Sequence, residues 1–315
     1  MYGQIPMGAS QTRETTVTPM IICAGEALID IARSGTAHPG GGPMNTAVAA
    51  ARLGAPAAFL GKVSTDSYGE IIWQHLVDSG VDTRLTQRGP EPTCLAIVEG
   101  DPPVFTFQGQ GTADTALDRP DMGAVGPGPH ILHGGTLGLF RRPGAAVLAE
   151  VAATHQGLVS LDPNVRPQII GSGGRSDWST WFRRWLPHVA VMRASDADLD
   201  WIWPGTGHDA IARDLFDRGV CCLIVTTAQG ATAYTPAGNT TAASQRVDVV
   251  DTVGAGDSFC GGYLTRLHEL GVATRDAAAG VDLDTWRDIL DFAGRVAAVT
   301  VQRVGADPPR RAEVV

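Results

Sequence analysis

One stretch decides how this chain is interpreted: Val249-Val250-Asp251-Thr252-Val253-Gly254-Ala255-Gly256-Asp257-Ser258-Phe259-Cys260-Gly261-Gly262-Tyr263-Leu264. It predicts a strand that ends at Asp251, then a glycine-rich turn, then a helix, because Phe259, Tyr263 and Leu267 recur at helical spacing. The turn therefore lies at a helix N-terminus. Small residues there let the backbone approach a ligand, and the free N–H groups of the helix favour negative charge.

Asp257 lies inside this predicted anion site, where a carboxylate repels a resting phosphate. Its position is consistent with a base that takes a proton from a hydroxyl group attacking phosphorus. The alternative is structural: Asp257 caps the helix beside an ordinary turn. The pattern Gly254–Asp257 alone favours the structural alternative, so the rest of the chain has to decide between them.

Two further loops carry polar groups beside predicted elements. The run Gly40-Gly41-Gly42-Pro43-Met44-Asn45 opens a helix of small residues, and Asn45 offers a donor and an acceptor to hydroxyl groups. The run Leu161-Asp162-Pro163-Asn164-Val165-Arg166-Pro167 follows a predicted strand, and Arg166 offers a cation to phosphoryl oxygens. Asp30 follows the first strand as a further acceptor. Each of these features, taken alone, is typical of an ordinary loop.

Strands and helices alternate along most of the chain. Strands are expected at 20–24, 57–63, 130–132, 157–161, 189–192 and 221–226, and helices at 45–53, 68–79, 144–154, 178–186 and 208–218. This order predicts an α/β fold with a central, mostly parallel sheet and helices on both faces. Segments 94–99 and 104–108 predict instead a β pair, which 29–33 is able to join, and we expect a small β flap there.

Composition excludes several classes of protein. The 315 residues are 43% hydrophobic, enough for a sizeable core, but no apolar run reaches the ~18 residues of a membrane helix. The net charge of −9 does not favour nucleic acid or anionic membranes, so neither is expected as a partner. The only lysine, Lys62, is followed by Val63, which excludes a P-loop, and protein-kinase signatures are missing.

The remaining sequence signals concern location and cofactor. Five cysteines without Cys-x-x-Cys spacing indicate reduced thiols and a cytoplasmic protein. Residues 1–19 lack a signal-peptide pattern, so we expect a disordered tail before one domain over 20–315. The run Gly205-Thr206-Gly207-His208-Asp209-Ala210 matches the dinucleotide fingerprint, but residues 199–204 before it look helical or turn-like. Because the fingerprint requires a strand there, we interpret the match as chance.

Taken together and in this order, the segments resemble the ribokinase-like (PfkB) carbohydrate kinases from about Ile21 to Val315. The segment Asp251–Asp257 resembles the C-terminal signature of that family, and 41–54 resembles its N-terminal signature. Gly25-Glu26 with Asp30, 105–107 leading to 111–114, and 162–166 resemble bacterial fructokinases most. The resemblance implies a ribokinase-like fold in which the flap, about 29–40 and 92–112, is a lid over the sugar.

The resemblance also implies a role for individual residues. Asp257 would deprotonate a primary hydroxyl of the sugar, and the amides of Gly254, Ala255 and Gly256 would form an anion hole for the phosphoryl group transferred from ATP. Sugar hydroxyls would be held by Asp30, Gly41, Gly42, Asn45 and Arg166. The nucleotide and its Mg²⁺ would be held by Asn164, Ser195, Asp198, Thr226, Gly230 and Gly294, with Asp198 acting on Mg²⁺ through water. A monovalent cation such as K⁺ would bind backbone carbonyls near Asp251 and Val253, together with the segment 300–305.

Several details depart from the family pattern. These are the shorter acid Asp198, a missing glycine in 226–230, Gly294 with Arg295, and Gln108-Gly109, where fructokinases often have an aromatic residue and an arginine.

Fructose is the expected sugar, with ribose, 2-keto-3-deoxygluconate and nucleosides as alternatives. Two different kinds of protein also compete with a kinase: an NAD-dependent oxidoreductase and a non-catalytic sugar-binding relative. The strand edges of the flap must be covered or paired, which predicts a homodimer through the lid.

Overall fold

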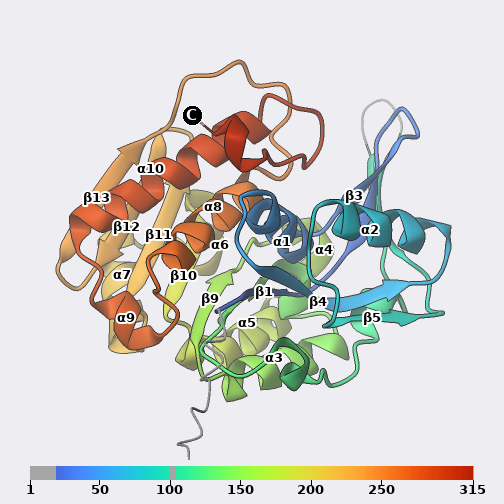
Figure 1. Ribbon diagram of the computed structural model, residues 1–315, viewed down its shortest axis with the longest axis horizontal. Helices are drawn as coiled ribbons and strands as arrows, with labels where there is room; N and C mark the ends of the chain where they lie inside the picture. The colour runs from blue at the N-terminus through green and yellow to red at the C-terminus, as the bar shows by residue number, and fades with distance from the viewer. Residues whose placement is uncertain (1–18, 100–103, 315) are drawn as a thin grey trace, which may run out of the picture.

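The centre of the molecule is a nine-stranded sheet in the order β13-β12-β11-β10-β9-β8-β1-β4-β5 (Figure 1). The computed structural model describes residues 19–99 and 104–314, so the tail expected at 1–19 lies almost wholly outside the described residues. Every neighbouring pair from β11 to β5 is parallel, and only β12 and β13 run antiparallel to their neighbours. The predicted mostly parallel sheet is therefore confirmed.

The elements have the following bounds. The strands of the main sheet are β1 (Ile21–Ala24), β4 (Ala57–Ser64), β5 (Thr86–Gly89), β8 (Ile131–Gly135), β9 (Leu158–Asp162), β10 (Val191–Ser195), β11 (Cys222–Thr227), β12 (Gly230–Thr235) and β13 (Gly238–Ala243). The α-helices are α1 (Gly42–Arg52), α2 (Ser67–Asp78), α3 (Gly144–Thr154), α4 (Pro167–Ile170), α5 (Arg175–Trp185), α6 (Asp196–Ile202), α7 (His208–Asp217), α8 (Ala255–Glu269), α9 (Arg275–Ala279) and α10 (Leu283–Thr300). No helix in the described part of the chain is long and apolar enough to cross a membrane.

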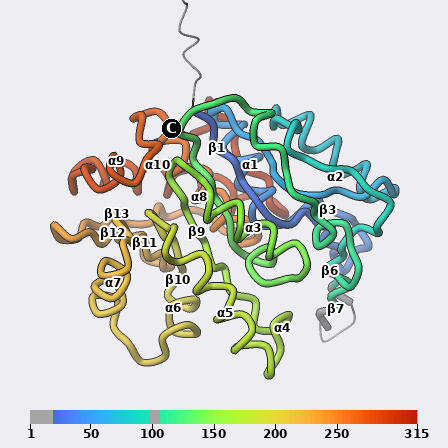
Figure 2. The backbone as a smooth tube through the Cα atoms, turned by 90° about the horizontal axis from the view of Figure 1, so that it is seen from below, coloured from blue at the N-terminus to red at the C-terminus, as the bar shows by residue number. Residues whose placement is uncertain are grey.

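Strand β1 shows why the sheet is covered on both faces. All four of its residues are buried, and successive side chains of a strand point to opposite faces. Ile21 and Cys23 pack in a core with α1, α8 and α10, whereas Ile22 and Ala24 pack in a second core with α3, α5 and α7. Figure 2 shows these two helical layers on either side of the sheet. The continuous apolar run of β1 is thus typical of a parallel strand buried on both faces.

A second, smaller sheet has the order β3-β2-β6-β7. It consists of β2 (Leu28–Ile31), β3 (Ala37–Gly40), β6 (Cys94–Glu99) and β7 (Val104–Gln108). Strands β6 and β7 form the antiparallel pair expected from the sequence, and β2 joins β6 in parallel. This sheet lies to one side of the main sheet, next to α1 and α2 (Figure 1).

The prediction of a strand that ends at Asp251 is wrong. Residues 244–253 form a loop after β13, and Val249 and Val250 are 61% and 60% exposed. The backbone N–H groups of Val250 and Asp251 both donate to the Val301 carbonyl, at 2.8 and 3.2 Å. Two valines in sequence suggest a strand, but here the segment is held against the end of α10 and has no strand partner.

Candidate active site

The loops that follow the parallel strands meet at one edge of the main sheet. Glu26 follows β1, Thr136 follows β8, Asn164 follows β9, and Thr226 lies near the end of β11. Helix α8 begins at the same edge and carries Asp257 in its first turn. In an open parallel sheet this edge is where ligands bind, because the strands end there together and their loops diverge.

Two cavities open at this edge, and they meet at the start of α8. The first has a volume of about 540 Å³ and is lined by most of the predicted catalytic and sugar-binding residues: Asp30, Gly41, Gly42, Asn45, Arg166, Gly254, Gly256 and Asp257. The second has a volume of about 570 Å³ and is lined by three of the predicted nucleotide residues together with the turn: Thr226, Gly230, Gly294, Ala255 and Gly256. Thr252 and Gly256 line both cavities, so a group bound in one lies next to a group bound in the other.

Glycines form the turn between the cavities because no side chain fits there. Gly254 has a φ of 75°, and a Cβ atom at this position would lie 2.5 Å from the Cβ of Ala306. A Cβ atom at Gly256 would lie 2.9 Å from a guanidinium nitrogen of Arg193. The absence of side chains at Gly254 and Gly256 therefore lets a bound anion approach the backbone at the start of α8, as the sequence predicted for this turn.

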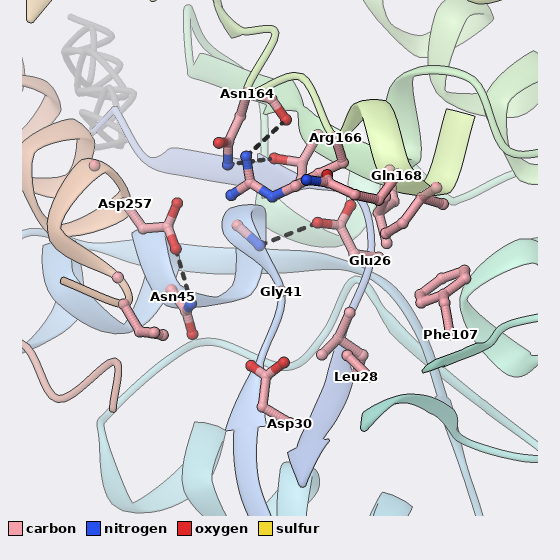
Figure 3. Close-up of a pocket in the computed structure, with 18 of the residues that line it drawn as sticks. Glu26, Leu28, Asp30, Gly41, Asn45, Phe107, Asn164, Arg166, Gln168 and Asp257 are labelled. Atoms are coloured by element: carbon pink, nitrogen blue, oxygen red, sulfur yellow. Dashed lines mark hydrogen bonds between the residues drawn. The ribbon is translucent and has the colours of Figure 1, made fainter. Parts of the chain in front are cut away.

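Asp257 is positioned by a side chain from the facing helix. The Asn45 amide in α1 donates a hydrogen bond of 2.8 Å to Asp257 Oδ2 (Figure 3). Burial raises the pKa of Asp257 to about 6, although the hydrogen bond from Asn45 acts in the opposite direction. The carboxylate is therefore ionised at neutral pH and still has an affinity for protons suited to a general base.

Asp30 lies across the first cavity from Asn164 and Arg166 (Figure 3). Burial, together with the nearby charge of Asp257, raises the pKa of Asp30 to about 6. A Cβ atom at Gly40, on the neighbouring strand β3, would overlap the Asp30 carboxylate. The glycine thus leaves room for a carboxylate that points into the cavity, where it can accept hydrogen bonds from hydroxyl groups.

Glu26 entered the sequence prediction only as part of the resemblance, yet it organises the sugar side of the site. Its carboxylate accepts hydrogen bonds from the backbone N–H groups of Gly42, at 3.0 Å, and Gly138, at 2.9 Å. The first contact, drawn in Figure 3, holds the start of α1, and the second holds the segment after β8. Burial raises the pKa of Glu26 to about 8. The signal in the sequence that could have identified Glu26 is an acidic residue between a buried strand and a glycine-rich loop.

The loop after β9 places Asn164 and Arg166 in the first cavity. Asn164 has a φ of 37°, and its side-chain amide donates to Thr136 Oγ1 at 3.1 Å. The guanidinium of Arg166 donates to the carbonyls of Asn164 and Val165, at 3.3 and 3.2 Å. Asn164, predicted to organise Mg²⁺ together with Asp198, lines the first cavity, and its role toward the metal stays a prediction.

Ser195 and Asp198 line neither cavity. Asp198 is buried, and its carboxylate accepts hydrogen bonds from the Val165 amide at 2.7 Å and from the Ser195 hydroxyl at 2.6 Å. These contacts hold the loop that carries Arg166. The role predicted for Asp198, which is to act on Mg²⁺ through water, stays a prediction.

Arg193 is a charged group for which the sequence carries no local signal. Its buried guanidinium donates to Asp162 at 2.7 Å and to Thr226 at 2.5 Å, and thereby joins the ends of β9, β10 and β11. It lines the second cavity next to Gly256. A fixed positive charge therefore lies beside the predicted anion-binding turn, on the side of the predicted nucleotide.

Asp251 connects the two loops that were predicted to hold a monovalent cation. Its carboxylate accepts hydrogen bonds from the Val253 amide, at 3.0 Å, and from the Gly305 amide, at 2.9 Å. The loop before α8 is therefore tied to the loop after α10. Binding of K⁺ near Asp251 and Val253 remains a prediction.

The dinucleotide fingerprint at Gly205 has no strand before it. Helix α6 ends at Ile202 and α7 begins at His208, so the run covers the end of the loop between these helices and the first residues of α7. The interpretation of this match as chance is confirmed. The hypothesis of an NAD-dependent oxidoreductase loses the feature on which it rested.

Comparison with known proteins agrees with this geometry. Residues 17–312 match the family model described as pfkB family carbohydrate kinase. This chain belongs to the pfkB family. A fructokinase from Rhizobium leguminosarum bv. trifolii is 34% identical over 284 residues, which cover 85% of this chain and 86% of the relative. The predicted family is therefore confirmed, and the chain is a carbohydrate kinase, a phosphotransferase.

Solved structures of fructokinases resemble this chain along nearly its whole length. A fructokinase from Xylella fastidiosa with bound ATP has a TM-score of 0.84 and 28% identity, and covers 94% of this chain and 97% of its own. A double-mutant fructokinase from Vibrio cholerae O395, in fructose, ADP and potassium ion bound form, has a TM-score of 0.77 and 27% identity, with coverages of 92% and 94%. The ribokinase-like fold expected from the resemblance is confirmed.

Proposed function

We propose that this pfkB family kinase transfers the γ-phosphoryl group of MgATP to a primary hydroxyl group of fructose. The observation that carries the proposal is the meeting of the two cavities at the start of α8, with Asp257 on one side and Arg193 on the other. The first cavity offers carboxylate and amide groups to a sugar. The second is lined by small and apolar residues, including Ala228, Val247 and Gly294, which suit the flat ring of a nucleotide.

In this mechanism Asp257 accepts the proton of the attacking hydroxyl. The sugar oxygen forms a bond to the γ-phosphorus, the bond from phosphorus to the β,γ-bridging oxygen breaks, and that oxygen leaves with ADP. Asn45 holds the carboxylate so that one oxygen faces the cavity. Removal of water from the site strengthens each electrostatic contact and limits hydrolysis of ATP.

The start of α8 and Arg193 act on the phosphoryl group. Phosphoryl transfer depends mainly on positioning and on stabilising charge on the equatorial oxygens. The turn Gly254–Gly256 lies where the cavities meet, and the amides of Gly254 and Gly256 would bind the phosphoryl oxygens, whereas the Ala255 amide donates to the Thr252 carbonyl at 3.3 Å. Arg193 would add a positive charge without having to move, since Asp162 and Thr226 already hold it.

The choice of fructose rests on the lining of the first cavity and on the relatives. Polar groups that include Asp30, Asn45 and Arg166 line the cavity, which suits the hydroxyl groups of a sugar ring. Apolar side chains also line it, which suits the C–H groups of the ring: Leu28, Ala96, Phe107, Leu137 and Ile169. The Rhizobium, Xylella and Vibrio relatives are named fructokinases.

The proposal extends to the lid, the cation and the location. The small sheet contributes Asp30, Ala96 and Phe107 to the first cavity, as a lid over the sugar would. The loops joined by Asp251 would hold K⁺ through backbone carbonyls. The five cysteines are free thiols in the structure, which favours a cytoplasmic protein.

Consumption of ATP over a panel of sugars tests the proposal. The panel contains fructose, ribose, 2-keto-3-deoxygluconate, glucose and a nucleoside, and phosphorus NMR identifies the hydroxyl that is phosphorylated. We expect the highest kcat/KM for fructose, and a loss of at least ~100-fold in Asp30→Ala, because a sugar hydroxyl in the cavity is left without its acceptor. A clearly higher kcat/KM for another sugar would overturn the assignment of fructose.

A further inference from the structure

Arg141 is a buried cation that the proposed mechanism does not use. It follows the short helix η3 (Thr136–Leu139), and its side chain is 11% exposed. The guanidinium donates to the Asp114 carboxylate, to the Gly109 carbonyl and, at 3.2 Å, to the Thr112 hydroxyl. This one side chain, which lies outside the lid, therefore binds three residues of segment 109–114, which follows the lid strand β7.

The same guanidinium lies over an aromatic ring of the lid. Its central carbon is 5.0 Å from the centre of the Phe107 ring, a distance at which a cation and an aromatic face attract each other. Phe107 lines the first cavity, opposite Asp257 and Asn45 (Figure 3). A displacement of Arg141 would therefore alter a wall of the sugar cavity without touching the catalytic carboxylate.

Residue 109 is a glycine because Arg141 and Phe107 already occupy the space beside it. A Cβ atom at Gly109 would lie 2.6 Å from Arg141 Nη2 and would overlap the Phe107 ring. The arginine that supports this part of the lid thus comes from the body of the protein and not from the lid strand itself. Arg141, Phe107 and Gly109 form one packed unit.

We propose that Arg141 is a positioning residue for sugar recognition, which fixes the Phe107 ring as the apolar wall of the first cavity. This inference rests on the proposed function of that cavity as the sugar site. The planar guanidinium supports the ring face, while Asp114, Thr112 and the Gly109 carbonyl fix the guanidinium itself. A lysine would keep the charge but not the planar face or the fork of donors.

Arg141→Lys tests the proposal, with Arg142→Lys as the matched control. Arg142 is the next residue, its side chain is 67% exposed, and its nearest carboxylate, Asp177, is 4.0 Å away. In Arg141→Lys we expect the KM for fructose to rise about tenfold, as loss of a partly desolvated cation–π contact implies, with kcat and the KM for ATP unchanged. Discrimination against the smaller sugar ribose should weaken. Arg142→Lys should behave as wild type.

A double-mutant cycle with Phe107→Leu separates a positioning role from a general structural one. If Arg141 acts through the ring, Arg141→Lys will change the KM for fructose by less than about twofold in the Phe107→Leu background. Two outcomes would overturn the proposal. In the first, the fold changes in KM of Arg141→Lys and Phe107→Leu simply multiply in the double variant. In the second, Arg141→Lys alone leaves the KM for fructose unchanged. Should Arg141→Lys fail to fold, Gly109→Ala serves instead, because a Cβ atom there meets both the Phe107 ring and Arg141 Nη2, so the KM for fructose should rise while kcat stays unchanged.

Failure of this inference is distinguishable from failure of the proposed function. The sugar panel on the wild-type enzyme first identifies the preferred sugar. The KM changes in Arg141→Lys, Arg142→Lys and Phe107→Leu are then measured with that sugar, whichever it is. A preferred sugar other than fructose contradicts the proposed function alone, whereas an Arg141→Lys enzyme with the wild-type KM for that sugar contradicts the role of Arg141.

Discussion

Burial of Asp257 has two opposite consequences, one for activity and one for stability. The pKa of about 6 makes the carboxylate a better base than an exposed aspartate, yet it leaves the base ionised at neutral pH. The same burial makes the ionised form costly in the folded state. Both consequences can be measured.

The activity should fall on the acid side of neutrality. Only the ionised carboxylate accepts a proton, so kcat/KM for the sugar should decrease as the pH falls through about 6. Asp30 titrates in the same range, so the apparent pKa belongs to the pair. A pH profile of kcat/KM between about pH 5 and 9 measures this limb. A flat profile down to the acid end of that range would contradict the assignment of the base.

The stability should respond in the opposite sense. A carboxyl group whose pKa is raised by folding binds its proton more tightly in the folded state, so its contribution to stability is present at low pH. That contribution is lost as the pH rises from about 4, the ordinary value, through about 6. At about pH 8, Asp257→Asn should therefore have a Tm at or above that of the wild type in thermal unfolding. A Tm several degrees lower would show that Asp257 is primarily structural.

Helix α8 provides a matched pair of glycines at its two ends. Gly254 and Gly271 have φ values of 75° and 71°, but a Cβ atom would overlap Ala306 at Gly254 and meets nothing within 4 Å at Gly271. Both Gly→Ala changes should cost about 1 kcal/mol or more through backbone strain. Gly254→Ala alone should also lower kcat by at least ~10-fold, because it displaces anion-hole donors. Equal kcat in the two variants would contradict the anion hole.

Helix α10 offers a test of the nucleotide cavity. Gly294 lines that cavity, and a Cβ atom there meets nothing within 4 Å. Gly294→Leu should fill part of the space and raise the KM for ATP about tenfold or more, with the KM for fructose unchanged. Gly294→Ala is the control, which should stabilise the helix slightly and leave both KM values near wild type. An unchanged KM for ATP in Gly294→Leu would place the nucleotide elsewhere.

The sequence predicted those elements whose signals are local. The start of α8 follows from its glycines and apolar spacing, and the pair β6–β7 follows from two alternating runs. The hairpin β12–β13 was missed because its small residues, such as those of Gly238–Ala243, lack a strong apolar pattern. The contacts of Arg193 and Arg141 could not be predicted from the sequence, because they join segments that only the fold brings together.

At the scale of the whole molecule, the small sheet has two open edges within the described chain. Strand β3 contains Pro39, which cannot donate to a further strand, so β7 is the edge better suited to pairing. We expect a homodimer formed through the lid, with β7 at or near the contact. Light scattering at micromolar concentration should give twice the mass of the 32.9 kDa chain. A monomer under these conditions would contradict this prediction.

Transfer of labelled γ-phosphate from ATP to fructose, compared between wild type and Asp257→Asn, tests the central claim most directly. The wild type should convert fructose to a phosphate ester at its primary hydroxyl, with one ATP consumed for each ester formed. Asp257→Asn should bind fructose and ATP but transfer phosphate ~10²- to 10⁴-fold more slowly, as expected for loss of a general base. A variant that transfers phosphate at the wild-type rate, or a wild type that leaves fructose unlabelled, would contradict the account.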